Sequence, residues 1–238
     1  PGMDVYYVYN QSPKLQFGIA MTAPYGGELD YNDGWVGRYV IQTVTFYTIN
    51  VNPSFSYKLN DNLAIGAGVA VEYMNLQQTV ALPFLAQNDG QMKISANNTH
   101  VGFNIGLILT PTDTTRIGLA YRSEIKHNLN GSLTFLKISN TPNVRLEMIM
   151  PQNLILSLDQ QWNKFALLAE VGWANWSAMQ NTILTVRGYS AITPLDWKDT
   201  YRLGLGAQYN VTKRFLLQTG VSYDSSPTTT AQIGRAHV

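Results

Sequence analysis

The sequence has no cysteine, three histidines and only 13% charged residues. The lack of cysteine excludes disulfides and thiolate metal sites. Neither His100 nor His127 has a second ligand at a spacing typical of metal centres, so we expect no metal and no cofactor. The formal net charge of +1 gives no reason to expect nucleic acid as a partner.

Long hydrophobic runs and catalytic motifs are also missing. Although 45% of the residues are hydrophobic, no run approaches the ~18 apolar residues of a membrane-spanning helix. Serine, histidine and aspartate all occur, but no nucleophile elbow or similar constellation is present. We therefore expect no catalytic residues and a protein that is not an enzyme.

What the sequence does contain is alternation, most regularly in residues 201–223. Side chains of a strand point alternately to its two faces. One face of this stretch carries Tyr201, Leu203, Leu205, Ala207 and Tyr209, and the other carries small or polar residues. Aromatics at both ends of an apolar face predict a membrane β-barrel hairpin, with lipid outside and water inside. A soluble antiparallel sheet with one buried face shows the same local pattern.

The spacing of the alternating stretches favours the membrane barrel over a soluble barrel or sandwich. Short connections at residues 58–62, 110–114, 162–164 and 210–214 alternate with long segments at 79–98, 127–150 and 187–197. Barrels with short periplasmic turns and long external loops have this asymmetry. The fold class expected is therefore all-β, an antiparallel transmembrane β-barrel. Within it, Pro53 is expected to mark a bulge.

The two ends of the sequence carry expectations of their own. The chain begins at Pro1 without an initiator Met or a signal peptide, so we expect a fragment or a processed product. Residues 233–238 read like the in-frame translation of a sequencing adapter and are expected not to be native. Residues 1–232 are assigned to one partial outer-membrane β-barrel domain.

Three stretches resemble the FadL-type outer-membrane long-chain fatty-acid transporters, whose relatives include aromatic-hydrocarbon channels (the OMPP1/FadL/TodX group). They are Leu119-Ala120-Tyr121-Arg122-Ser123-Glu124-Ile125-Lys126, Trp173-Ala174-Asn175-Trp176-Ser177 and Trp197-Lys198-Asp199-Thr200-Tyr201-Arg202-Leu203-Gly204-Leu205-Gly206. The resemblance implies a 14-stranded barrel in the outer membrane of a Gram-negative bacterium, monomeric when complete. It also implies an N-terminal plug and last strands that this chain would lack.

A charged group on the inner face is a candidate ligand site. Arg122, Glu124 and Lys126 share one face of their strand, and Lys198 and Arg202 lie on a later one. The cations Arg122, Lys198 and Arg202 could hold a fatty-acid carboxylate by charge-assisted hydrogen bonds. The alternative is a ladder of ion pairs that braces the wall, with Glu72, Glu124 and Glu170 as partners.

Apolar residues in the long segments form a second candidate site. Leu82, Phe84 and Leu85 lie in the first segment, and Phe135 and Leu136 in the second. In water such residues must cover each other or a ligand. The resemblance suggests a groove that captures lipid, and simple loop packing explains the same residues equally well. Four tryptophans are interpreted as aromatics of the membrane interface: Trp162, Trp173, Trp176 and Trp197.

The stretch Ala23–Gly27 is a candidate break in the wall. Pro24 removes a hydrogen-bond donor, and two adjacent glycines permit a bend. The resemblance implies a kinked strand with a lateral opening beside a Tyr-Gly pair. An ordinary strand end with a Pro-Gly turn is the alternative. The residues concerned are Pro24, Tyr25, Gly26 and Gly27.

Together these features favour passive uptake of long-chain fatty acids or other hydrophobic compounds, including aromatic hydrocarbons. Capture in external loops, a lumenal site and lateral release would be the steps. The expected partners are the hydrophobic molecules and outer-membrane lipid. A structural or adhesive outer-membrane barrel and a polar-solute porin are the competing hypotheses.

Overall fold

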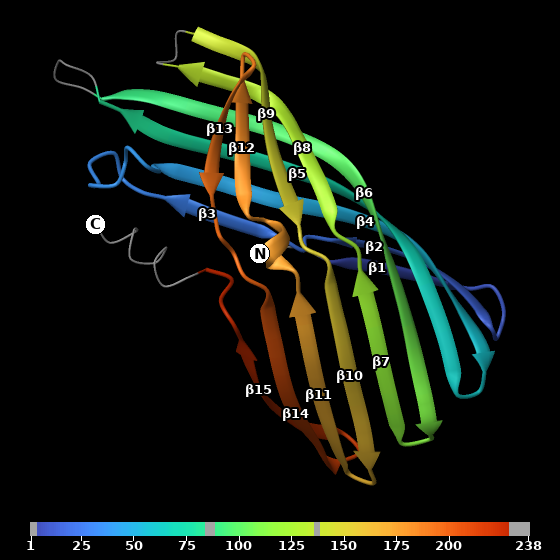
Figure 1. Cartoon of the computed structure of the whole chain (residues 1–238). Helices are drawn as coiled ribbons and strands as arrows, with labels where there is room; N and C mark the ends of the chain where they lie inside the picture. The colour runs from blue at the N-terminus through green and yellow to red at the C-terminus, as the bar shows by residue number, and fades with distance from the viewer. Residues whose placement is uncertain (1–3, 84–88, 136–138, 229–238) are drawn as a thin grey trace.

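The computed structural model describes residues 4–83, 89–135 and 139–228, which form one antiparallel sheet of fifteen strands (Figure 1). The first strands are β1 (Val5–Asn10), β2 (Leu15–Thr22), β3 (Gly26–Asp30), β4 (Thr43–Asn60), β5 (Leu63–Leu82) and β6 (Gly90–Thr112). The middle strands are β7 (Thr115–Arg122), β8 (Ile125–Phe135), β9 (Ser139–Met150), β10 (Asn153–Trp162) and β11 (Phe165–Ala174). The one-turn 3₁₀ helix η1 (Trp176–Ala178) precedes β12 (Asn181–Val186), β13 (Tyr189–Pro194), β14 (Thr200–Thr212) and β15 (Phe215–Asp224). No helix in this described part is long and apolar enough to cross a membrane.

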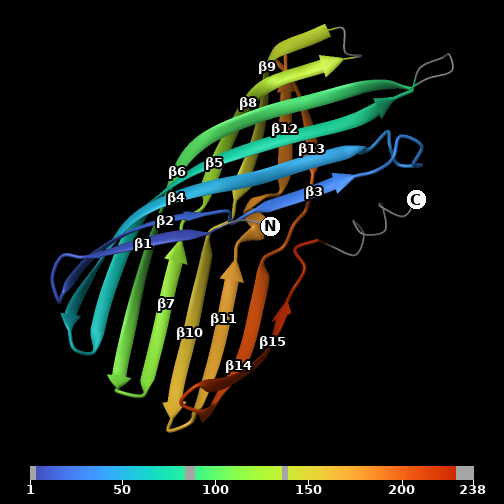
Figure 2. The ribbon, with the colours of Figure 1, turned by 180° about the vertical axis from the view of Figure 1, so that it is seen from behind.

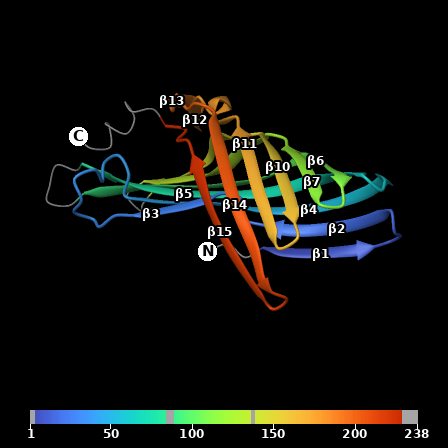
Figure 3. The same ribbon diagram turned by 90° about the horizontal axis from the view of Figure 1, so that it is seen from below.

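The strands form a curved wall that continues into an extension at one end. The wall runs in the order β1-β2-β4-β5-β6-β7-β10-β11-β14-β15. Figures 2 and 3 show this wall curving around an open interior. Among the described residues β1 pairs only with β2, and β15 only with β14. The structure is therefore an incomplete barrel.

The outward face of the wall is apolar and exposed. Phe17, Val69, Val101 and Leu205 are 46%, 47%, 55% and 59% exposed. A soluble sandwich would bury this row, because burial of apolar surface is its main source of stability. A wall with apolar residues outside and Gly, Ser and Asn on the alternate positions fits lipid instead. The predicted fold class is confirmed, and the soluble alternative is wrong.

Where the structure describes them, the three long connecting segments consist mostly of strands instead of irregular loops. Residues 79–98 lie mostly in the ends of β5 and β6, which pair as far as Leu82↔Gly90. Residues 127–135 and 139–150 belong to the β8–β9 hairpin, and most of 187–197 belongs to the β12–β13 hairpin and the stretch after it. In β6 the apolar face of this part is short: Ile94 and Ala96 are buried between the polar Lys93, Ser95 and Asn97, but the next residue on their face is Asn98. The expectation of long loops is corrected to an extension made of hairpins.

Pro53 does not produce the expected bulge. β4 pairs with β5 at Val51↔Val71 and again at Ser54↔Gly68, so the register is the same on both sides of the proline. Because proline lacks an N–H, it interrupts the ladder without shifting it. The register shift in this hairpin occurs between Lys58 and Asn60, beside the turn.

Breaks in several strands separate the wall from the extension. β4 pairs first with β3 and then with β2, and β6 pairs first with β8 and then with β7. The long strands β4, β5 and β6 thus cross the junction unbroken, whereas their neighbours stop and restart. The interruptions fall at residues 23–25, 123–124, 151–152, 175–180 and 195–199.

Candidate functional site

A cavity of about 330 Å³ lies at the level of these breaks. Its lining includes Pro24 and Tyr25 from the break between β2 and β3, and Pro151 from the break between β9 and β10. Trp176 comes from η1, and Arg122 ends β7. We call this space the junction cavity. The stretch predicted to interrupt the wall therefore does interrupt a strand and does face a cavity.

The Pro24 stretch makes a bulge. β2 and β3 both pair with β4, but the register changes by one residue between Thr22↔Asn50 and Gly26↔Tyr47. Tyr25 anchors the bulge: its N–H donates to Thr48 Oγ1 at 3.1 Å, and its carbonyl accepts from Thr48 N–H at 2.9 Å. Gly26 and Gly27 are the first residues of β3 and are exposed. The interruption expected at this stretch is present as a bulge that Thr48 holds, and the lateral opening stays a prediction.

Aromatic rings cover the cavity on the side of η1. Trp176 contacts Tyr25 edge to face with 6.0 Å between the ring centroids, and Trp197 meets Trp176 in the same way at 5.3 Å. Trp162 is different, since it is half-exposed on the wall and stacks on Phe165. The interpretation as a uniform interface belt therefore fits Trp162 and does not describe the packed pair Trp176 and Trp197.

Asp199 fixes the aromatic segment in place. Trp173 Nε1 donates to Asp199 Oδ2 at 2.9 Å, and the Ser177 N–H donates to Asp199 Oδ1 at 3.1 Å. Hydrogen bonds from Ser177 and then Trp173 hold the pKa of the Asp199 carboxylate below its usual range, against the opposing effect of burial. Sequence reasoning missed this role, although Asp199 stands in the quoted stretch that begins at Trp197.

Two of the three predicted cations meet at the junction cavity. Arg122 and Arg202 both line it, while Lys198 is exposed and outside the lining. Arg202 Nε lies 2.7 Å from Asp224 Oδ1 and forms an ion pair. Arg122 forms no ion pair with a carboxylate of the described residues. The idea of a three-cation cluster is thus corrected to one cation that is paired and one that is not.

The predicted ladder of inner-face charges is also broken. The strand ends at Arg122, so Glu124 and Lys126 are not in line with it. Lys126 Nζ and Glu124 lie 3.0 Å apart and pair with each other, and Glu72 contacts His127 instead of an arginine. The gap between β7 and β8 at residues 123–124 interrupts the strand, so the period-2 alternation that placed Arg122, Glu124 and Lys126 on one face does not continue through it.

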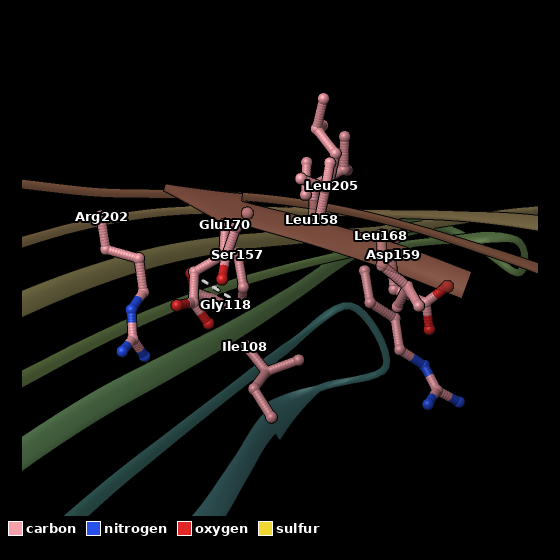
Figure 4. Close-up of a pocket in the computed structure, with 16 residues that line it drawn as sticks. Ile108, Gly118, Ser157, Leu158, Asp159, Leu168, Glu170, Arg202 and Leu205 are labelled. Atoms are coloured by element: carbon pink, nitrogen blue, oxygen red, sulfur yellow. Dashed lines mark hydrogen bonds between the residues drawn. The ribbon is translucent and has the colours of Figure 1, made fainter. Parts of the chain in front are cut away.

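The cavities of the inner face share residues. A larger cavity of about 650 Å³, the wall cavity, lies among β6, β7, β10, β11, β14 and β15, and it shares Glu170 and Arg202 with the junction cavity. Figure 4 shows Leu205 on one side of the sheet, and Ile108, Glu170 and Arg202 on the other. A third cavity of about 460 Å³ shares Arg122 with the junction cavity. The junction cavity therefore adjoins both of the others.

The predicted apolar residues of the long segments lie at the far end of the extension. Leu82 pairs with Gly90, and Phe135 pairs with Met92, so β6 brings both to one end of the sheet. Neither lines the junction cavity. Phe84, Leu85 and Leu136 lie outside the described residues. The two cations and the wall break thus meet in one site, and the apolar residues do not join it.

A wall of this kind, with an apolar exposed exterior and cavities on a polar interior, defines an outer-membrane β-barrel protein. Residues 3–234 match the model of the family described as outer membrane protein transport protein (OMPP1/FadL/TodX), and the chain belongs to that family. It is 26% identical to the long-chain fatty acid transport protein of Salmonella typhi, over 94% of this chain and 60% of that protein.

Solved structures agree with this assignment. A FadL homologue of Pseudomonas aeruginosa superimposes with a TM-score of 0.87 at 25% identity, over 95% of this chain and 60% of the homologue. The toluene transporter TbuX of Ralstonia pickettii superimposes with a TM-score of 0.75 at 19% identity, over 93% of this chain and 68% of TbuX, which supports the fold. The chain spans about 60% of the length of the curated relatives it matches.

Proposed function

We propose that the complete protein takes up hydrophobic molecules passively across the outer membrane, with long-chain fatty acids as its most suitable substrate. The observation that carries this is the junction cavity, where a strand break meets aromatic rings and an arginine that has no carboxylate partner among the described residues. Apolar rings suit an acyl chain, and the guanidinium of Arg122 suits its carboxylate. The protein works as a monomer.

The path has three steps. Apolar residues at the end of the extension, among them Leu82 and Phe135, capture the molecule from outside. It then moves to the junction cavity beside Arg122 and Arg202. From there it leaves sideways past Pro24 and Tyr25 into the membrane. Release into the membrane avoids exposing the chain to water, at about 0.8 kcal/mol per CH₂.

Aromatic hydrocarbons are the second candidate substrate, because the rings of Tyr25, Trp173 and Trp176 line the junction cavity. An uncharged aromatic substrate has no carboxylate and would bind without an ion pair to Arg122. A structural or adhesive barrel and a polar-solute porin are the competing functions. A porin would take up small polar solutes, and a structural barrel would take up neither these nor hydrophobic molecules.

The test is uptake by cells that lack related transporters and express the complete protein. We expect uptake of a radiolabelled long-chain fatty acid to rise above the level in cells with an empty vector. Uptake of a small sugar should stay at the vector level. Sugar uptake without fatty-acid uptake would identify a porin, and no uptake of fatty acid, toluene or sugar would identify a structural barrel.

A further inference from the structure

Two neighbouring turns at one end of the wall carry three cations and no acidic residue. The turn between β10 and β11 holds Lys164, and the turn between β14 and β15 holds Lys213 and Arg214. The Asn210 N–H donates to the Lys164 carbonyl at 2.8 Å, which joins the two turns. The three cations are exposed, and none forms an ion pair with a carboxylate of the described residues.

Aromatic rings lie directly beside these cations on the apolar face of the wall. Trp162 and Phe165 are register partners on either side of the first turn, and their rings stack with 5.8 Å between the centroids. Tyr209 of β14 pairs with Phe165, and Phe215 begins β15 directly after the second turn. All four rings are exposed. We call these four rings and the three cations the turn patch.

The position of the turn patch matches the surface of a membrane. Both turns lie at the end of the wall opposite the extension (Figure 1). Short turns of outer-membrane barrels face the periplasm, and their aromatic rings gather where the membrane meets water. A strand advances about 3.3 Å per residue, so cations one or two residues beyond such rings reach the depth of the lipid headgroups. This depth corresponds to the phosphate groups of the periplasmic leaflet.

The other described turns at this end carry a different charge. Lys58 pairs with Asp61 at 2.8 Å, and Lys14 of the neighbouring turn also acts electrostatically on Asp61. The turn between β6 and β7 holds Asp113 and no cation. Among these turns, positive charge without a carboxylate beside it is therefore confined to the turn patch.

We propose that the turn patch binds the headgroup of an anionic phospholipid in the periplasmic leaflet. Arg214 and the two lysines donate charge-assisted hydrogen bonds to the phosphate oxygens, and the rings contact the glycerol and the first methylenes of the acyl chains. A zwitterionic headgroup carries its own ammonium and leaves the cations without a counterion, so the anionic lipid is preferred. Other residues line the three cavities described above, so this binding does not depend on the proposed transport path.

The first measurement is quenching of Trp162 fluorescence by brominated lipids, with the complete protein in vesicles of phosphatidylcholine. Bromine on an acyl chain quenches a tryptophan that the lipid contacts. Trp162→Phe supplies the signal of the other tryptophans, which is subtracted. At equal mole fractions we expect brominated phosphatidylglycerol to be enriched at Trp162 about fivefold over brominated phosphatidylcholine, which is equivalent to about 1 kcal/mol for one basic contact. Equal quenching by the two lipids would overturn the proposal.

Two variants that each remove two positive charges separate the site from the general charge of this end. Lys164→Gln combined with Lys213→Gln should remove most of the preference for phosphatidylglycerol. Lys14→Gln combined with Lys58→Gln is the matched control beside Asp61 and should keep it. Heat-modifiable gel mobility checks that both variants fold. An equal loss in both, or no loss in the first, would contradict a site at the turn patch.

Salt provides a test on the unaltered protein, which decides if a variant does not fold. Raising the salt from about 0.01 M to about 1 M shortens the Debye length from about 30 Å to about 3 Å. We expect the preference for phosphatidylglycerol at Trp162 to fall towards one over this range. A preference that salt does not change would exclude the three cations as its cause.

Discussion

Tyr25 meets Trp176 edge to face, with 6.0 Å between the ring centroids and 81° between the ring planes. Tyr25 stands in the break between β2 and β3, and Trp176 in the break between β11 and β12. The contact therefore joins two strand breaks that are far apart in the sequence, and both residues line the junction cavity. The proposed path requires this contact to open before a molecule in the junction cavity can move on.

Removing the larger ring should open the cavity. We expect Trp176→Ala in the complete protein to accelerate dissociation of a fluorescent fatty acid, measured by stopped flow, because Tyr25 and Trp197 both lose a ring contact. Such a contact is worth about 0.5–1.5 kcal/mol. Trp162→Ala is the matched control, since that ring is half-exposed on the wall. Equal acceleration in both variants would place the effect elsewhere.

The two arginines should differ in their effect on ligand selectivity. Arg202 is paired with Asp224, whereas Arg122 is not paired with a carboxylate of the described residues. Arg122→Gln should weaken binding of a long-chain fatty acid and leave binding of an uncharged hydrocarbon of similar size nearly unchanged. Isothermal titration of both ligands provides the measurement. Replacing Lys198 and Arg202 together should have the smaller effect, and equal losses for both ligands would point to a structural role.

The alternation along β14 and β15 predicts which side chains face lipid and which face the aqueous interior. Cysteines at Leu203, Leu205 and Leu217 should react with a lipid-soluble reagent, and cysteines at Gly204 and Gln218 with a water-soluble one. Leu205→Arg should lower the free energy of unfolding in lipid by about 2–4 kcal/mol if the site is near the midplane. Reversed labelling would disprove this assignment of the two faces. Chemical unfolding of the Leu205→Arg variant in lipid vesicles checks it independently.

Acid should release the aromatic segment through Asp199. Hydrogen bonds from Ser177 and Trp173 lower the pKa of this carboxylate in the folded state. A lowered folded pKa means that the contribution to stability is present above the unfolded value of about 3.9 and is lost as the pH falls through the folded value. Fluorescence of Trp173 against pH measures this. Asp199→Asn should abolish the transition, and an unchanged curve in that variant would assign the transition to another group.

Much of the wall follows from the sequence because one physical rule sets it. Lipid outside and water inside impose strict alternation, and rows such as Leu203 and Leu205 show it clearly. The break at Pro24 was also predictable, since proline and two glycines oppose a regular strand. Alternation in Ile125, His127, Leu129 and Leu133 could have revealed β8 as well.

The junction cavity could be predicted only in part. The alternation of side chains placed Arg122 and Arg202 on the inner face. That only Arg202 forms an ion pair depends on the register of β14 and β15, which brings Asp224 beside it. The contact of Trp176 with Tyr25 joins distant breaks, and nothing in the local pattern encodes it. The contact of His127 with Glu72 was missed for the same reason, because it joins β8 to β5 and these strands do not pair with each other.

The most direct test of the account is to straighten the break at residues 23–27 in the complete protein. Deleting Gly26, or replacing Pro24 and Gly27 by Val, should let β2 continue into β3 and close the wall beside Tyr25. Folding is checked by heat-modifiable gel mobility, and uptake of a radiolabelled long-chain fatty acid is then measured. We predict a folded barrel that binds the fatty acid and no longer delivers it. A folded, straightened variant that transports at the normal rate would contradict lateral release at this site.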